Sequence, residues 1–187
     1  MQPILQRILA TFEQRGNRQY GQEAVTQLQH ALQSGQLALR SGATDKLTVA
    51  ALLHDIGHLL VEEAMPESCK QNLDDKHETI GYSFLHTHFG KAVADPVRLH
   101  VVAKRYLCTT KPDYESKLSP TSCKSYHDQG GPMTPEEQQA FEAEPFYHDA
   151  LRLRHWDDTA KDPQAETVDL NTFLPQIQSC LKENIDR

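Results

Sequence analysis

Apolar residues recur at intervals of three and four positions along most of the chain, which is the spacing of one face of an α-helix. No segment keeps the apolar–polar alternation that is typical of a half-buried strand. We therefore predict an all-α fold, with helices over residues 3–16, 22–40, 44–56, 77–86, 91–107, 146–157 and 169–184, and a further helix that begins at Thr134-Pro135. No repeat or low-complexity segment divides the pattern, so residues 1–187 are expected to form a single domain.

Two segments interrupt the helical pattern. Residues 63–75 and residues 108–134 are predicted to be loops, and the second contains Gly130-Gly131-Pro132, a signature of a turn. Because long irregular segments in compact domains often carry function, residues 108–134 are a candidate part of a site.

The composition narrows the range of partners. A formal net charge of −7 argues against nucleic acid, whose phosphate backbone is bound by clustered Lys and Arg. A small anionic substrate needs only a few local cations and stays compatible with this charge. No stretch approaches the roughly 20 apolar residues that span a membrane. The N-terminal segment reads as an amphipathic helix and not as a signal peptide, so we expect a cytoplasmic protein without a membrane partner.

The strongest local signal is the adjacent pair His54-Asp55, which lies near the end of the very apolar predicted helix 44–56. Burying a carboxylate without a partner is costly, and a metal ion bound by both side chains would remove that cost. An isolated His-Asp pair is more often a hydrogen-bonded structural pair at a helix end. The same chain, however, carries further candidate ligands in predicted helices, namely His30, His77, His100 and Asp157.

This order of residues, His … His-Asp … His … His … Asp, resembles the HD-domain superfamily and its dinuclear branch. The resemblance implies an HD-domain helical bundle. It implies one metal held by His30, His54, Asp55 and Asp157, and a second held by Asp55, His77 and His100. Histidine and carboxylate ligands suit iron or manganese, and the family pattern favours two iron ions as an Fe(II)/Fe(III) pair.

Longer segments sharpen the resemblance. Residues 20–30, 50–58, 100–107, 129–133 and 154–157 are similar to the PhnZ-type family of 2-amino-1-hydroxyethylphosphonate dioxygenases, relatives of inositol oxygenase. The resemblance covers the chain from about Tyr20 to Asp158. It implies an oxygenase of phosphonate catabolism that uses O2 to cleave the carbon–phosphorus bond of (R)-2-amino-1-hydroxyethylphosphonate, giving glycine and phosphate.

Three potential cations accompany the predicted ligands. His58 follows His54 by four residues, Lys104 follows His100 by four, and Arg154 precedes Asp157 by three, which are same-face spacings in a helix. Cations beside metal ligands suit a phosphonate anion, although Lys104 and Arg154 could equally neutralise ligand carboxylates. The resemblance implies phosphonate binding by His58, Lys104, Ser122 and Arg154.

Tyr20 and Glu23 precede His30, and Glu23 is expected to share its helix face because seven residues make about two turns. The resemblance implies that this pair covers the iron, with Tyr20 over the metal and Glu23 meeting the substrate ammonium. A carboxylate suits a primary ammonium, whereas a quaternary ammonium favours an aromatic cage. A glutamate in the first turn of a helix is also a common structural feature.

Three alternatives remain open from the sequence. A dinuclear HD-domain phosphohydrolase would use the same ligands with a metal-bound hydroxide, and an iron and O2 requirement would distinguish the oxygenase from it. A degenerate HD module that only binds ligands would lack metal ligands, yet all six are present. The substrate could also be a related 1-hydroxyphosphonate, namely the hydroxymethyl, 1-hydroxyethyl or trimethylammonio analogue.

Overall fold

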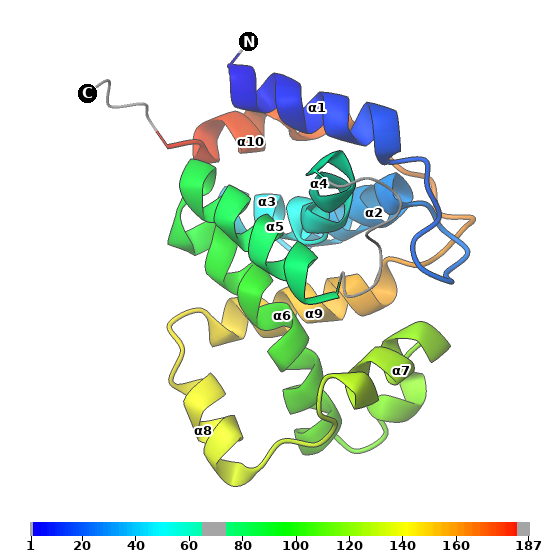
Figure 1. Cartoon of the computed structure of the whole chain (residues 1–187), viewed down its shortest axis with the longest axis vertical. Helices are drawn as coiled ribbons and strands as arrows, with labels where there is room; N and C mark the ends of the chain where they lie inside the picture. The colour runs from blue at the N-terminus through cyan, green and yellow to red at the C-terminus, as the bar shows by residue number, and fades with distance from the viewer. Residues whose placement is uncertain (1, 65–73, 183–187) are drawn as a thin grey trace.

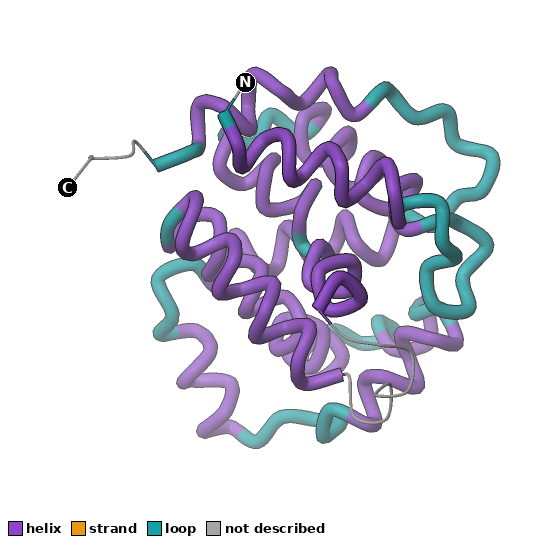
Figure 2. The backbone as a smooth tube through the Cα atoms, turned by 45° about the horizontal axis from the view of Figure 1, so that its top comes forward, coloured by secondary structure: helices purple, strands orange, loops and turns teal. Residues whose placement is uncertain are grey.

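Helices make up the regular structure of the chain, as Figure 2 shows. The computed structural model describes residues 2–64 and 74–182, and it describes residues 62–64 and 74–77 by their backbone alone. The helices are α1 (Pro3–Arg15), α2 (Gln27–Arg40), α3 (Asp45–Leu53), α4 (Ile56–Ala64), α5 (Asp74–Phe89), α6 (Lys91–Thr110), α7 (Pro120–Asp128), α8 (Pro135–Glu142), α9 (Tyr147–Thr159) and α10 (Leu174–Cys180). Short 3-10 helices lie at Glu115–Lys117 and Leu170–Phe173. The predicted all-α fold is confirmed.

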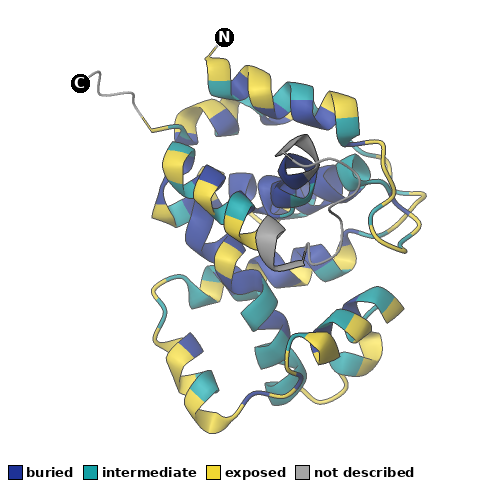
Figure 3. Ribbon diagram, in the orientation of Figure 1, coloured by how far each residue is buried: buried dark blue, intermediate teal, exposed yellow. Residues whose placement is uncertain are grey.

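The helices form two regions that share α6 (Figure 1). In the upper region, α1 and α10 cover α2 to α5 and the adjoining half of α6, and α9 crosses below them. In the lower region, α7 and α8 lie on either side of the second half of α6. A large apolar cluster fills the upper region, and a small one, formed by Leu99, Ala103, Met133, Phe141 and Ala150, lies in the lower region. Figure 3 shows the same contrast, because the buried surface concentrates in the upper helices.

Helix α2 begins later than the sequence pattern predicts. It starts at Gln27 because Thr26 and Gln29 form a capping box, in which each side chain bonds to the backbone of the other residue. The preceding residues turn back instead, and the Tyr20 N–H donates to the Val25 carbonyl. The prediction of helix at residues 22–26 is therefore wrong, and Glu23 lies in a loop.

The predicted helix 44–56 is interrupted at the His-Asp pair. Helix α3 ends at Leu53, α4 begins at Ile56, and His54 and Asp55 occupy the turn between them. Both residues therefore lie at the junction of the two helices, outside the regular turns of either one.

The predicted loop at residues 108–134 contains helix α7, so this expectation is wrong in part. Ser119 caps α7, since its hydroxyl accepts from the Ser122 N–H, and Pro120 occupies the first turn. The turn at Gly130 and Gly131 is present, with φ angles of 107° and 63°. The last helix is also shorter than predicted, since α10 ends at Cys180.

The backbones of α4 and α5 approach each other closely at two glycines. A Cβ atom added at Gly81 would lie 3.2 Å from the Gly57 Cα atom, so a larger residue there requires a shift of the helices. Among the described residues, no helix combines the length and the apolar character needed to cross a membrane.

Candidate metal centre

Three buried side chains from three different parts of the fold converge below the large apolar cluster of the upper region. The Nε2 atoms of His30 (α2) and His54 lie 3.1 Å apart. An oxygen of Asp157 (α9) lies 3.4 Å from His30 Nε2 and 3.8 Å from His54 Nε2. The exposed fraction is 1%, 4% and 2% for His30, His54 and Asp157 respectively. These spacings allow one metal ion to be bound by one atom of each side chain.

Backbone carbonyls fix the orientation of the histidine rings. His30 Nδ1 donates to Ala160 O at 2.8 Å, and His54 Nδ1 donates to Ala51 O at 2.8 Å. With the proton on Nδ1, each Nε2 presents its lone pair to the centre, which is the tautomer that a metal ligand requires.

Asp55 completes the set through an oxygen that lies 3.3 Å from His54 Nε2 and 3.6 Å from His30 Nε2. Among the described residues, this buried oxygen and the facing oxygen of Asp157 form no hydrogen bond. Unpartnered buried carboxylate oxygens are costly. Both lie close to the imidazole nitrogens of His30 and His54, so each is placed to bind a cation held by these nitrogens.

The electrostatics of the cluster keep its carboxylates charged. Burial opposes ionisation of Asp157, but Arg154 and the two histidines outweigh it and hold its pKa well below the usual value. Burial likewise opposes ionisation of Asp55, and His54 holds its pKa well below the usual value. Burial lowers the pKa of His54, but the two carboxylates outweigh it and raise that pKa to about 10. Metal binding would therefore displace a proton from His54.

His100, on α6, borders the same centre. Its ring packs edge-on against His54 with centroids 5.4 Å apart, and its Nδ1 donates to Val97 O at 2.5 Å. Burial, followed by His54, lowers the pKa of His100 to about 4, so the ring is neutral and its Nε2 is available as a ligand. The side chain of His77, the remaining predicted ligand, lies outside the described residues. The backbone of α5 passes beside α4 and α6.

Tyr20 covers the centre from the loop before α2. Its ring stacks on His30 with centroids 3.9 Å apart. Burial, together with Asp55 and Asp157, raises the pKa of Tyr20, so the phenol stays protonated. Glu23 is brought to the cavity by this loop and not by the helix face predicted from its spacing to His30.

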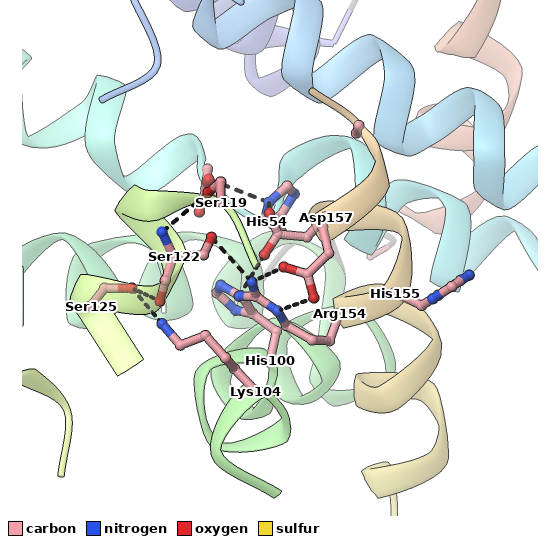
Figure 4. A network of polar contacts seen from close by, with 12 residues as sticks. His54, His100, Lys104, Ser119, Ser122, Ser125, Arg154, His155 and Asp157 are labelled. Carbon is pink, nitrogen blue, oxygen red and sulfur yellow. Dashed lines mark hydrogen bonds and ion pairs between the residues drawn. The ribbon is translucent and has the colours of Figure 1, made fainter. Parts of the chain in front are cut away.

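A cavity of about 540 Å³ opens beside the metal ligands and extends to α7. Its lining includes the candidate ligands His54, Asp55, His100 and Asp157, and also Lys104, Ser122 and Arg154. Figure 4 shows the serines of α7 and Lys104 on one side of this network and Arg154 with Asp157 on the other.

The predicted cations occupy different environments. Arg154 is 3% exposed and pairs with both Asp157, at 2.8 Å, and Asp158. Lys104 is 2% exposed and donates to Ser125 Oγ at 2.5 Å. No carboxylate among the described residues pairs with it, and burial, followed by Arg154, lowers its pKa to about 8. His58 lies on α4 with its Nε2 3.9 Å from Asp55, and its ring is partly exposed.

Sequence reasoning missed several residues of this site. Ser119 and Ser125 lie one turn on either side of Ser122 along α7, a spacing of three that marks one helix face. Lys161 contacts Glu23 and Ser122 from the segment after α9. The Ser119-Pro120 start signal of α7 was readable, and it would have placed the three serines on one helix.

Known proteins resemble this chain over nearly its whole length. A sequence profile of the HD domain matches residues 27–144. Hydroxymethylphosphonate dioxygenase of Gimesia maris is 45% identical over 181 residues, which are 96% of this chain and 90% of that protein. The glycine-betaine-forming [1-hydroxy-2-(trimethylamino)ethyl]phosphonate dioxygenase of Leisingera caerulea is 38% identical over 182 residues, which are 97% of this chain and 92% of that protein.

Proposed function

The chain belongs to the HD-domain family, in the branch of the hydroxyphosphonate dioxygenases, and on this premise we propose that it is a di-iron oxygenase that uses O2 to cleave the carbon–phosphorus bond of a 1-hydroxyphosphonate. One observation carries the proposal. A single cavity joins a cluster of metal-binding side chains to a cluster of buried cations and hydroxyls. An anion bound by the cations would be held against the metals.

The ligand set of the proposal is the one that the resemblance implies. His30, His54, Asp55 and Asp157 would hold one iron, and Asp55, His77 and His100 would hold the other. The unpartnered oxygens of Asp55 and Asp157 support this arrangement. When bound, the metals would supply Lewis acidity toward the substrate hydroxyl and electrons for O2.

The protein's part is to bind and orient the phosphonate. Lys104 would supply a charge that no carboxylate among the described residues neutralises, and Arg154 and Ser122 would supply hydrogen-bond donors. His58, which also lines the cavity, would contribute a further donor. Because Lys104 is buried, its attraction for an anion is screened less than that of a surface lysine.

For the substrate we propose (R)-2-amino-1-hydroxyethylphosphonate, which with O2 balances to glycine and phosphate. The carboxylate of Glu23, which faces the cavity, supports an ammonium group at that end. A second candidate is hydroxymethylphosphonate, which would give formic acid and phosphate. The relative from Gimesia maris that is 45% identical favours it, and so does the pairing of Glu23 with Lys161.

The decisive experiment incubates the iron-loaded enzyme with each phosphonate in air and under argon. We expect phosphate release in air, together with glycine or formic acid, and O2 consumption equal to the phosphate formed. Phosphate release that continues under argon would indicate a phosphohydrolase and would exclude the oxygenase. Turnover of hydroxymethylphosphonate alone would overturn the amino substrate but not the oxygenase.

A further inference from the structure

Lys161 joins three segments around the cavity. Its Nζ atom lies 2.8 Å from Ser122 Oγ and 3.5 Å from Ser119 Oγ, both on α7. It also lies 3.5 Å from Glu23 Oε1, in the loop before α2. The side chains of Lys161 and Glu23 are 11% and 13% exposed. This lysine therefore lies at the cavity wall and within reach of an occupant.

The contacts of the Ser122 hydroxyl indicate which kind of ligand could bind at this wall of the cavity. Its oxygen accepts from Lys161 at 2.8 Å and from Arg154 at 3.5 Å. A hydroxyl has two lone pairs and one proton, so these two contacts leave the proton free to be donated. Among the described residues no acceptor takes that proton. Two cations that converge on one hydroxyl with an unused proton are suited to an anion.

The ion pair between Lys161 and Glu23 is the loosest of the charged contacts around this hydroxyl. Arg154 is held by two carboxylates, at 2.8 Å from Asp157 and in a bidentate contact with Asp158. Among the described residues, Lys161 has one carboxylate partner at 3.5 Å, and that carboxylate oxygen also accepts from Ser119 at 2.5 Å. The Lys161–Glu23 pair can therefore open while Glu23 keeps one partner.

We propose that Lys161 determines the substrate range as an exchangeable counter-ion of Glu23. An amino-substituted phosphonate displaces Lys161 from Glu23 with its own ammonium, and the released Lys161 pairs with the phosphonate. A phosphonate without an amino group leaves Lys161 in place, where it neutralises Glu23 and shares its charge with the phosphonate. In both complexes no buried charge is left without a partner, which is the arrangement that low dielectric demands. This inference rests on the proposed phosphonate substrates.

The two substrates should respond differently to loss of the lysine. In Lys161→Gln, Glu23 keeps its charge without its counter-ion, so it attracts an ammonium more strongly and repels a phosphonate that lacks one. We expect the dissociation constant of hydroxymethylphosphonate to rise about 10- to 100-fold, the range for loss of a contact with a charged group. The dissociation constant of the amino substrate should change by less than about threefold, since the stronger attraction of Glu23 offsets the lost contact with the phosphonate.

The experiment measures both dissociation constants by calorimetry on iron-loaded protein under argon, where no turnover occurs. Lys161→Arg keeps the charge and should restore the ratio of the two constants to that of the wild type. Glu23→Gln should weaken binding of the amino substrate and leave hydroxymethylphosphonate bound at least as tightly. Lys117→Gln, at an exposed lysine next to α7, is the matched control and should change neither constant. In air, Lys161→Gln should raise KM for hydroxymethylphosphonate and leave kcat within about threefold, because the residue positions the phosphonate only.

The outcomes separate the inference from the proposed function. If the ratio of the two constants moves less than about threefold in Lys161→Gln, Lys161 does not set the substrate range. A uniform loss for both substrates would likewise overturn the exchange. If the wild-type protein binds neither phosphonate, the proposed function itself fails.

Discussion

The two ends of the cavity differ in the amount of apolar packing that supports them. The metal end lies against the large apolar cluster of the upper region, and His30 and His54 are fixed by backbone carbonyls. The end that we propose to bind the phosphonate lies on α7 and on the lower half of α6, where the apolar cluster is small and the serines bond mostly to other polar side chains. Because of this difference, we expect substitutions among the proposed metal ligands to disturb the site more than substitutions among the proposed phosphonate-binding residues.

The largest effect should come from the metal end. In Asp157→Asn the cluster loses a carboxylate and Arg154 loses a charged partner. We expect metal affinity to fall by more than about 100-fold, since loss of a supporting contact alone costs 10- to 100-fold. Iron content after gel filtration and O2 consumption measure this loss. His155→Gln is the matched control, because His155 is exposed and points away from the network (Figure 4). Full iron retention in Asp157→Asn would contradict the assignment.

Removing a buried apolar side chain should also destabilise the protein more in the upper region than in the lower region. Leu53→Ala removes a fully buried side chain next to His54 and should lower the free energy of unfolding by about 2–5 kcal/mol. Met133→Ala, in the small lower cluster, should cost about 1–3 kcal/mol, because its partly exposed neighbours can fill the space. Urea unfolding followed by circular dichroism measures both. Equal losses would show that the two regions are equally well supported.

The phosphonate end should lose its affinity at alkaline pH. Burial lowers the pKa of Lys104 to about 8, so the lysine is cationic below pH 8 and becomes neutral above it. An anion binds the cationic form, and its attraction is present below this pKa and lost as the pH rises through it. We expect KM for the phosphonate to rise up to about tenfold per pH unit above 8, with iron content unchanged.

Lys104→Arg is the control for this pH dependence, because a guanidinium stays charged throughout the range. Its KM should remain flat between pH 8 and pH 9. A rise of KM in Lys104→Arg that matches the wild type would assign the titration to another group.

The smallest effect should come from the hydroxyl beside Lys104. Ser125→Ala removes the hydrogen bond at 2.5 Å from the lysine and leaves the charge in place. We expect KM to change about two- to tenfold, corresponding to one ordinary hydrogen bond, with kcat unchanged. Ser116→Ala, at an exposed serine whose hydroxyl bonds only to the nearby Asp113 carbonyl, should leave KM unaltered. A loss of iron in Ser125→Ala would mean that the two ends are not independent.

From the sequence, the helices and the clustered His and Asp side chains could be predicted more fully than the contacts made by α7 and Lys161. The His54-Asp55 pair, His30 and Asp157 were recognisable because polar residues within apolar helices need a partner, and the structure brings these four together. The helical period also led to the all-α fold, since it depends on local spacing alone.

The predictions were wrong where a capping residue ends a helix before the helical spacing of apolar residues does. Thr26 stops α2 from extending to Glu23, so the position of Glu23 depends on a loop conformation and not on helical spacing. Lys161 escaped notice because nothing in its neighbourhood along the chain indicates Glu23, which is far away in sequence. Contacts of this kind are set by tertiary packing, which a single sequence does not reveal.

The contact between Gly57 and Gly81 limits how the centre can vary. Helix α5 carries His77 one turn before Gly81, and a single methyl group at position 81 would have to displace one backbone from the other. The spacing between the backbones of α4 and α5 thus depends on a place where both side chains are hydrogen atoms. A substitution at Gly81 would therefore shift the backbone that carries position 77 relative to the His54-Asp55 turn, without changing any proposed ligand.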